Sequence, residues 1–269
     1  MNPSTILGLI LAVLIVAVSA MFSVRHPSDL FDLPSLILVV GGTMAATLIS
    51  YPLREVVRVF KVFVIVLRNE QLYAREDLNE IVRVSRKYFQ GDIATLNQEL
   101  VHCKNPFLRT GVQLVIDGAP VADIVELLQW RISKLKARET AEAQIFRSMA
   151  MYAPAFGMLG TLLGLTNLLH GLQSDFQSIG ASLALAMITT LYGILLANLL
   201  FKPIAIKFER RTERRVMQMN MVLEGVTLMA QRRSPSFIRL YLESLEERHE
   251  DEIRQTGTKV DTAAGPSGK

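Results

Sequence analysis

Four apolar stretches, each long enough to cross a lipid bilayer, constrain this chain more than any other feature. About 20 residues of α-helix, rising 1.5 Å per residue, span the hydrocarbon core of a membrane. Residues 5–24 and 33–53 hold no charged side chain, and residues 149–172 and 181–206 are interrupted only by His170 and Lys202. The first stretch is too long for the apolar part of a signal peptide, and no Lys or Arg precedes it. The sequence therefore predicts an all-α integral membrane protein with four transmembrane helices.

The basic residues predict how these helices are oriented. Of the 29 Lys and Arg residues, fifteen lie in residues 54–148 and thirteen lie at or after Lys202. Only Arg25 follows the first stretch, and residues 173–180 contain none. The positive-inside rule places the long middle segment and both chain ends in the cytoplasm. The formal net charge of +4 then indicates membrane topology and contact with anionic lipid heads rather than nucleic acid.

These boundaries divide the chain into five expected segments. They are transmembrane helices 1 and 2 (1–53), a cytoplasmic helical lobe (54–148), transmembrane helices 3 and 4 (149–206), a cytoplasmic helical extension (207–254) and a disordered tail (255–269). Gly111, Gly118 and Pro120 mark expected turns in the lobe, and Asn105–Pro106 marks a helix start. Because neither Gly nor Pro occurs between Pro120 and Pro154, the last lobe helix is expected to continue into the third membrane helix.

The third and fourth stretches each carry small and hydroxyl residues at helical spacing. The first stripe is Ala153, Gly157, Gly160, Gly164, Asn167 and Gly171, and the second is Ser182, Ala186, Thr190, Gly193 and Ala197, with Thr189 beside Thr190. Small residues let helices approach closely in lipid, and a hydroxyl group can also offer oxygen to a cation. Both interpretations, helix packing and an ion pathway, are open at this point.

Several kinds of chemistry have no support in the sequence. There is no phosphate-binding Gly-rich loop and no dinucleotide fingerprint, so we expect no enzyme and no cofactor. The four His residues are scattered, and Cys103 is the only cysteine, so we expect no metal site and no internal disulfide. The membrane stretches contain no central acid, which a proton or cation relay normally needs. Either the chain conducts nothing or a partner supplies the carboxylate, and the Thr-bearing stripes favour the partner.

Three residues near the membrane edges have two interpretations each. Asp32 precedes the second stretch, where its carboxylate is either a cation-concentrating group at the outer mouth or a helix-terminus residue. Pro154 and Pro203 lie near the cytoplasmic ends of the third and fourth stretches, as either static kinks or hinges.

Several motifs in fixed order point to one family. They are Phe31–Asp32, residues 38–42 (LVVGG), 106–118 (PFLRTGVQLVIDG), 154–165 (PAFGMLGTLLGL) and 189–193 (TTLYG), followed by Ala197, Asn198 and Pro203. Together they resemble the flagellar motor stator A subunit of the MotA/PomA type, in the MotA/TolQ/ExbB proton channel superfamily. The resemblance extends over residues 6–237.

This resemblance implies a homo-pentamer in the bacterial inner membrane around B subunits, each with one membrane helix that carries an ion-accepting Asp. Ion flow would turn the ring, and the cytoplasmic lobe would push a rotor switch protein. The resemblance assigns four residues of this chain to the ion pathway: Thr161, Thr189, Thr190 and Asp32.

Other residues of this chain match further features of the family. Pro154 and Pro203 match prolines linked to conformational coupling. Arg86 and Lys87 resemble a basic pair that contacts the rotor, and Glu99 resembles its acidic partner. The alternative for these three charges is a solvated surface. We expect Gly157, Gly160, Gly164 and Gly193 to serve helix packing.

The resemblance also bears on the transported ion. Hydroxyls at both Thr161 and Thr190 resemble the sodium-driven branch, because a Na⁺ ion that sheds water needs replacement oxygens. Thr also occurs in membrane helices as a residue that bonds the backbone, so H⁺ is the alternative. Two other functions compete: a non-conducting membrane scaffold, and a TolQ/ExbB-like energiser of outer-membrane processes, which is expected to have three membrane helices rather than four.

Overall fold

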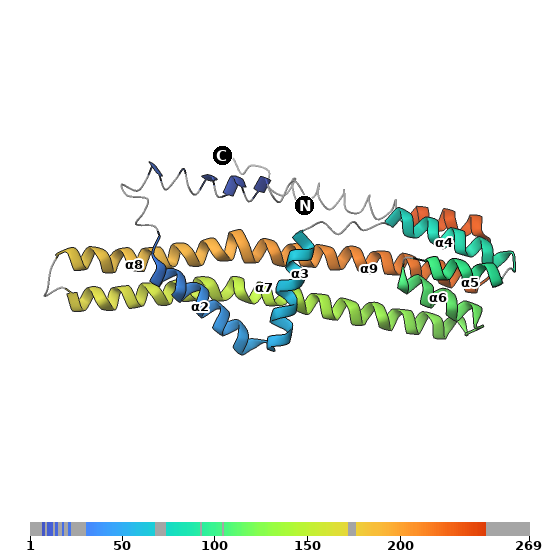
Figure 1. Ribbon diagram of the computed structural model, residues 1–269, viewed down its shortest axis with the longest axis horizontal. Helices are drawn as coiled ribbons and strands as arrows, with labels where there is room; N and C mark the ends of the chain where they lie inside the picture. The colour runs from blue at the N-terminus through green and yellow to red at the C-terminus, as the bar shows by residue number, and fades with distance from the viewer. Residues whose placement is uncertain are drawn as a thin grey trace, which may run out of the picture. The chain divides into compact units, whose positions relative to one another are not determined.

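The computed structural model describes residues 31–67, 74–91, 93–103, 105–171 and 176–245, with separate helical residues between 7 and 22. The regular structure of these residues is entirely helical, which confirms the all-α expectation for the described part of the chain (Figure 1). The helices are α2 (Leu33–Ser50), α3 (Leu53–Leu67), α4 (Ala74–Phe89), α5 (Ile93–His102), α6 (Pro106–Ile116), α7 (Val121–Gly171), α8 (Phe176–Leu195), η2 (Leu196–Phe201), α9 (Lys202–Ala230) and a helix over 235–245. Most of the expected first span and the whole expected tail lie outside the described residues.

Among the described residues, three helices are long and apolar enough to cross a membrane: Leu33–Ser50, Val121–Leu169 and Ile179–Ala230. They cover most of the second and third spans expected from the sequence (33–53 and 149–172) and all of the fourth (181–206). The fourth begins earlier than expected, because α8 already starts at Phe176.

The chain forms two compact units. The membrane unit comprises the described residues of 1–71 and 137–212, and the lobe unit those of 72–136 and 213–269. The membrane unit includes α3 because its aromatic side chains pack on α7, where the Phe60 and Phe146 rings lie 6.0 Å apart. The Phe146 ring also lies 5.4 Å from the ring of Phe208 of α9, so edge-to-face and tilted aromatic contacts hold three helices together.

The start and end of α2 follow from its terminal residues. The Asp32 carboxylate accepts a hydrogen bond from the Ser35 backbone N–H at 2.8 Å, and Pro34 occupies the first turn. Pro52 cannot donate a backbone hydrogen bond, so α2 ends at Ser50 and α3 starts at Leu53. The buried residues of α2 recur every four positions: Ser35, Val39, Thr43 and Thr47.

In the lobe unit, one apolar core joins α4, α5, α6, the start of α7, the end of α9 and the helix over 235–245. Asn105 accepts hydrogen bonds from Phe107 and Leu108 and so caps α6, which confirms the expected helix start. Gly118, with a φ of +73°, lies in the turn between α6 and α7, also as expected.

The expected turn at Gly111 is wrong, because this residue lies inside α6. A Cβ there would lie 2.9 Å from the side chain of Val226. The glycine therefore serves close helix packing rather than a change of direction.

The third span and the lobe share one helix. α7 runs for 51 residues and passes through Pro154 without ending, so the expected continuity from the lobe helix into the membrane span is confirmed. On the return path α8, η2 and α9 follow each other without a break. The π-helix η2, which immediately precedes Lys202–Pro203, was not predicted from the sequence.

Candidate ion pathway

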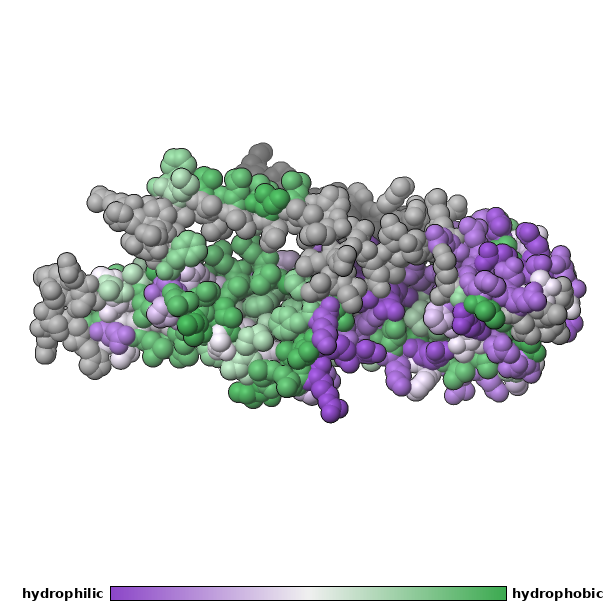
Figure 2. All heavy atoms as spheres, viewed as in Figure 1, coloured by the Kyte–Doolittle hydropathy of each residue, from purple (hydrophilic) through white to green (hydrophobic). Residues whose placement is uncertain are grey.

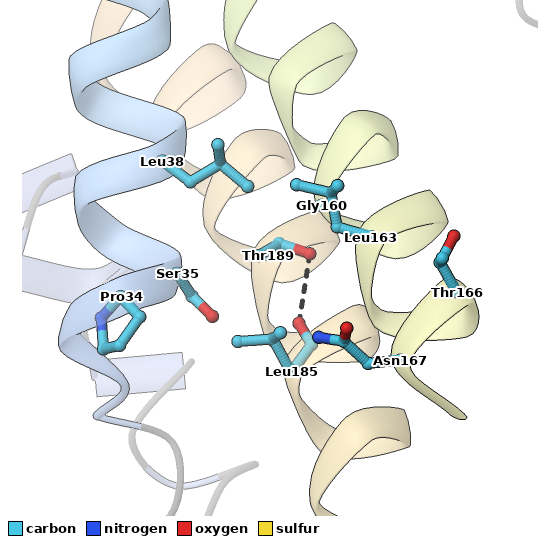
Figure 3. A pocket seen from close by; sticks show the side chains of 9 residues that line it. All are labelled: Pro34, Ser35, Leu38, Gly160, Leu163, Thr166, Asn167, Leu185 and Thr189. Atoms are coloured by element: carbon cyan, nitrogen blue, oxygen red, sulfur yellow. Dashed lines mark hydrogen bonds between the residues drawn. The ribbon is translucent and has the colours of Figure 1, made fainter. Parts of the chain in front are cut away.

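A cavity of about 290 Å³ lies between α2, α7 and α8 in the membrane unit. Its lining residues are Pro34, Ser35 and Leu38 of α2, Gly160, Leu163, Thr166 and Asn167 of α7, and Leu185 and Thr189 of α8. Figure 3 shows Ser35 and Asn167 directed towards α8 from opposite sides, whereas the Thr166 hydroxyl points away. The cavity is thus mainly apolar, with a few inward polar groups.

Ser35 is the polar residue of this cavity that most needs an explanation. It is 1% exposed, and its Oγ atom has no hydrogen-bond partner. A buried hydroxyl left without a partner costs about 1–3 kcal/mol, and a cavity of this size has room for water. Ser35 therefore supplies an unused oxygen at the boundary of α2 and α8.

The predicted pathway threonines occupy different environments. Thr189 is fully buried and lines the cavity. Its hydroxyl group donates a hydrogen bond to the Ala186 carbonyl oxygen at 2.9 Å. Thr190 is partly buried, with its Oγ1 3.5 Å from the carbonyl oxygens of Gly157 and Ala186. Thr161 is also partly buried and donates to the Met158 carbonyl oxygen at 2.6 Å. Thr161 and Thr190 are not lining residues of this cavity.

Asp32 connects α2 to α8. Besides capping α2, it donates its backbone N–H to the Tyr192 hydroxyl of α8 at 3.1 Å. Asp32 thus has the helix-terminus role that was one of its two interpretations, and it lies three residues from Ser35, which lines the cavity.

The predicted packing glycines lie where α7 meets α8. A Cβ at Gly157 would lie 3.0 Å from the Thr189 carbonyl oxygen, and one at Gly193 would lie 2.7 Å from the Ala153 carbonyl oxygen. At Gly160 and Gly164 the added atom would approach Thr189 at 2.5 Å and Ala186 at 2.8 Å. The two small stripes therefore contact each other within one chain.

The two prolines differ in their surroundings. Pro154 lies inside α7, with its Cα 3.1 Å from a Cβ built on Gly193, so it packs against α8. Pro203 is exposed and lies two residues after the end of η2, where the Lys202 N–H donates to the Ala197 carbonyl oxygen five residues earlier. A proline lacks a backbone N–H, so the turn before it cannot keep every α-helical hydrogen bond. The π-helical hydrogen bonding lies in this turn.

The predicted rotor charges lie in the lobe unit. Arg86 and Lys87 occupy the last turn of α4, where positive charge is favourable to the helix dipole. Glu99 of α5 pairs with Arg83 at 3.2 Å. Glu99 thus forms its ion pair with Arg83, which lies about one helical turn before Arg86 and Lys87.

A stripe of hydroxyl residues on α2 was not predicted from the sequence. Thr43 and Thr47 are buried and donate to the carbonyl oxygens of Val39 and Thr43 at 2.6 and 2.7 Å. The signal was present, because Ser35, Thr43 and Thr47 share one helix face by their four-residue multiples. Among the described residues, no group of three or more His, Cys, Asp or Glu side chains is placed to hold a metal ion.

The described helices and the cavity between them define a helical, multi-pass membrane protein with closely packed α7 and α8. Residues 100–221 match the MotA/TolQ/ExbB proton channel family. Two curated proteins and one solved structure extend the match over most of the chain.

Motility protein A of Borreliella burgdorferi is 33% identical over 84% of this chain and 86% of its own length. Chemotaxis protein PomA of Vibrio alginolyticus is 28% identical over 91% of this chain and 95% of its own. The structure of C. jejuni MotAB has a chain with the same fold, with a TM-score of 0.84 at 21% identity over 91% of this chain and 96% of that one.

The chain therefore belongs to the motility protein A family, the flagellar stator A subunits that its motifs resembled. A channel family is not a family of enzymes, so the expectation that this chain is not an enzyme is also confirmed.

Proposed function

We propose that this chain is the ion-conducting A subunit of a flagellar motor stator, which couples cation flow to torque on the rotor together with a B subunit. The observation that carries the proposal is the family match combined with the composition of the spans: residues 149–172 and 181–201 contain no Asp, Glu, Lys or Arg. A conducting pathway through these helices needs an ionisable group from elsewhere.

A B subunit with one membrane helix bearing an Asp is the proposed source of that group. The solved structure with the same fold is a MotAB assembly, which supports such a partner here. We place the contact on the hydroxyl-bearing side of α7 and α8, with Thr161 and Thr190 nearest the foreign carboxylate and Thr189 and Asp32 along the route. Pro154 and Pro203 would transmit the resulting movement to the lobe.

The proposed topology has four membrane spans and both ends in the cytoplasm of the bacterial inner membrane. The charge distribution supports it, since Arg25 is the only Lys or Arg outside the spans on the proposed outer side. Five copies of the chain would surround the B helices, and α4 and α5 would contact the rotor switch protein through Arg86, Lys87 and Glu99.

Ion flux tests the proposal directly. We expect a strain that lacks this chain to lose swimming, and the chain expressed with its B subunit to carry Na⁺ or H⁺ current. Thr190→Ala should change the ion dependence of swimming while assembly with the B subunit persists. Thr227→Ala is the matched control, because Thr227 also bonds a carbonyl of its own helix but lies in the lobe unit. Unchanged motility of Thr190→Ala in sodium and proton media would remove Thr190 from the pathway.

The non-conducting scaffold is the second candidate, and one observation favours it. The small stripes of α7 and α8 contact each other, so packing alone explains them. A scaffold would give no flux in any ionic medium, even with the B subunit present.

Charge reversal in the lobe separates torque from conduction. Arg86→Glu with Lys87→Glu should abolish swimming and leave ion flux intact, because both residues lie in the lobe unit rather than in the membrane spans. If swimming is unchanged, the rotor contact lies elsewhere.

A further inference from the structure

Helix α3 is expected to lie along the surface of the membrane. α2 has 18 residues and so measures about 27 Å, close to the thickness of about 30 Å of the hydrocarbon core. Only Tyr51 and Pro52 separate it from α3. Figure 1 shows α3 turning away from α2 and crossing α7. A helix that starts where a span ends and crosses the bundle lies along the interface between lipid and water.

One face of α3 is fixed to the rest of the membrane unit. Val56 and Val59 are buried, and Phe60 and Phe63 pack on the ring of Phe146. These residues fall within one arc of the helix, at a spacing of three and four. This face anchors α3 and cannot receive a ligand.

The opposite face carries the basic residues. Arg54, Arg58 and Lys61 follow each other at intervals of four and three, with Val57 between them, so they form one stripe. With Leu53 they line an open groove of about 420 Å³. Leu53 and Val57 are exposed apolar residues beside the cations. In Figure 2 a group of hydrophilic atoms projects next to the hydrophobic surface of α2 at the place where α3 crosses the unit.

We propose that this basic stripe of α3 (Arg54, Arg58 and Lys61) is a binding site for the headgroup of an anionic phospholipid of the cytoplasmic leaflet. The cations would contact the phosphate, and the exposed Leu53 and Val57 would meet the first part of the acyl chains. Basic residues beside a membrane span attract anionic lipid in this way, and long cationic side chains bury their stems while their charged ends reach the headgroups. The proposal rests on the proposed orientation of the chain, and it does not require that the chain conducts ions.

An ion pair with a buried acid positions the middle cation. The Nε atom of Arg58 lies 3.0 Å from Glu142 of α7, whose side chain is 5% exposed, whereas the Arg58 side chain is 37% exposed. One edge of the guanidinium is thus held by the protein, and its other N–H groups remain for a second anion. Arg138 lies 3.7 Å from the same carboxylate, so the buried acid has two cations around it. A surface between copies of this chain is the competing use of the stripe, and it would need a matching acidic face.

The test measures lipid binding by the full chain purified with its B subunit in neutral detergent. Short-chain phosphatidylglycerol and phosphatidylcholine are titrated against the wild type and against Arg54→Gln/Lys61→Gln. Arg58 is left intact because Glu142 depends on it. Since each basic residue near an anionic surface contributes roughly fivefold, the double variant should bind phosphatidylglycerol about 25-fold more weakly and phosphatidylcholine equally well. Lys134→Gln/Lys136→Gln removes the same charge from exposed positions of the lobe unit and should change neither affinity.

Any of four results would overturn the lipid site. The first is equal binding of both lipids by the wild type, and the second is phosphatidylglycerol binding that the double variant retains in full. The third is displacement of the lipid by inorganic phosphate at matched concentrations, which would assign the stripe to a small anion. If the double variant changes the subunit number of the complex and not its lipid affinity, the stripe is a contact between copies and the proposal is wrong. Absent ion flux in the wild type would instead refute the proposed function, whatever the lipid result.

Discussion

Gly160 of α7 lies directly against the side chain of Thr189 of α8, so that a Cβ added at Gly160 would come within 2.5 Å of it. The same Thr189 lines the cavity between α2, α7 and α8. The glycine therefore sets the distance between the two helices at the level of the proposed pathway, and it joins helix packing and ion pathway in one contact.

Gly160→Ala should destabilise the membrane unit. A helical alanine gains about 1 kcal/mol over glycine, but overpacking a close contact costs about 1–3 kcal/mol, so the net effect should be a loss of about 1 kcal/mol. Thermal unfolding of the purified protein in detergent measures it.

Gly180→Ala is the matched control for this substitution. Gly180 also lies in a helix, and nothing lies within 4 Å of a Cβ built there. This variant should gain the helix stability that alanine provides over glycine without creating a steric clash. It should therefore be more stable than the wild type. Equal shifts for Gly160→Ala and Gly180→Ala would contradict the packing role of Gly160.

The helical spans and the small stripes were readable from the sequence, because helical periodicity and apolar length are properties of neighbouring residues. What a stripe faces is a different matter. Gly157 and Gly193 contact the partner helix of the same chain, which spacing alone could not distinguish from contact with a foreign helix. The turn predicted at Gly111 was wrong for a related reason. Only the position of Val226, 115 residues away, reveals that this glycine serves packing.

The cavity was beyond the reach of sequence reasoning for a physical reason. Ser35, Asn167 and Thr189 come from three helices, and their convergence depends on the angles at which these helices cross. Capping, in contrast, is local, so the helix start at Asn105 and the helix-terminus role of Asp32 were both accessible.

Ser35→Ala should leave stability unchanged or raise it. The Ser35 hydroxyl is buried without a hydrogen-bond partner, so its removal relieves a cost of about 1–3 kcal/mol and loses no bond. Thr43→Ala on the same helix face removes a hydroxyl that bonds the Val39 carbonyl and should destabilise by about 1 kcal/mol. Thermal unfolding compares the two variants. A stability loss for Ser35→Ala as large as that for Thr43→Ala would mean that the Ser35 hydroxyl has a partner, such as a bound water.

Cys103 should be unreactive in the folded protein. Burial raises the pKa of its thiol to about 11, and only the thiolate reacts with alkylating reagents. At neutral pH we expect labelling by a maleimide to follow opening of the lobe unit, so its rate should rise steeply with denaturant. Fast labelling of the native protein would show that the thiol is accessible, contrary to its place in the lobe core.

The Asp77 carboxyl makes the stability of the lobe unit depend on pH, in a direction that its pKa fixes. Burial raises the pKa of this carboxyl above its ordinary value of 3.8, although Asn105 donates a hydrogen bond to it. The folded state therefore holds the proton more tightly than the unfolded state, and stability from this group falls as pH rises from 3.8 through the folded pKa. Asp77→Asn keeps a hydrogen-bonding side chain and removes the charge, so it should stabilise the protein at neutral pH and have little effect below pH 3.8, where the native carboxyl is already protonated. Denaturant unfolding at neutral pH and below pH 3.8 measures this difference in the free energy of unfolding. A stabilisation that is equal at both would show that the substitution acts through packing and not through the ionised carboxylate.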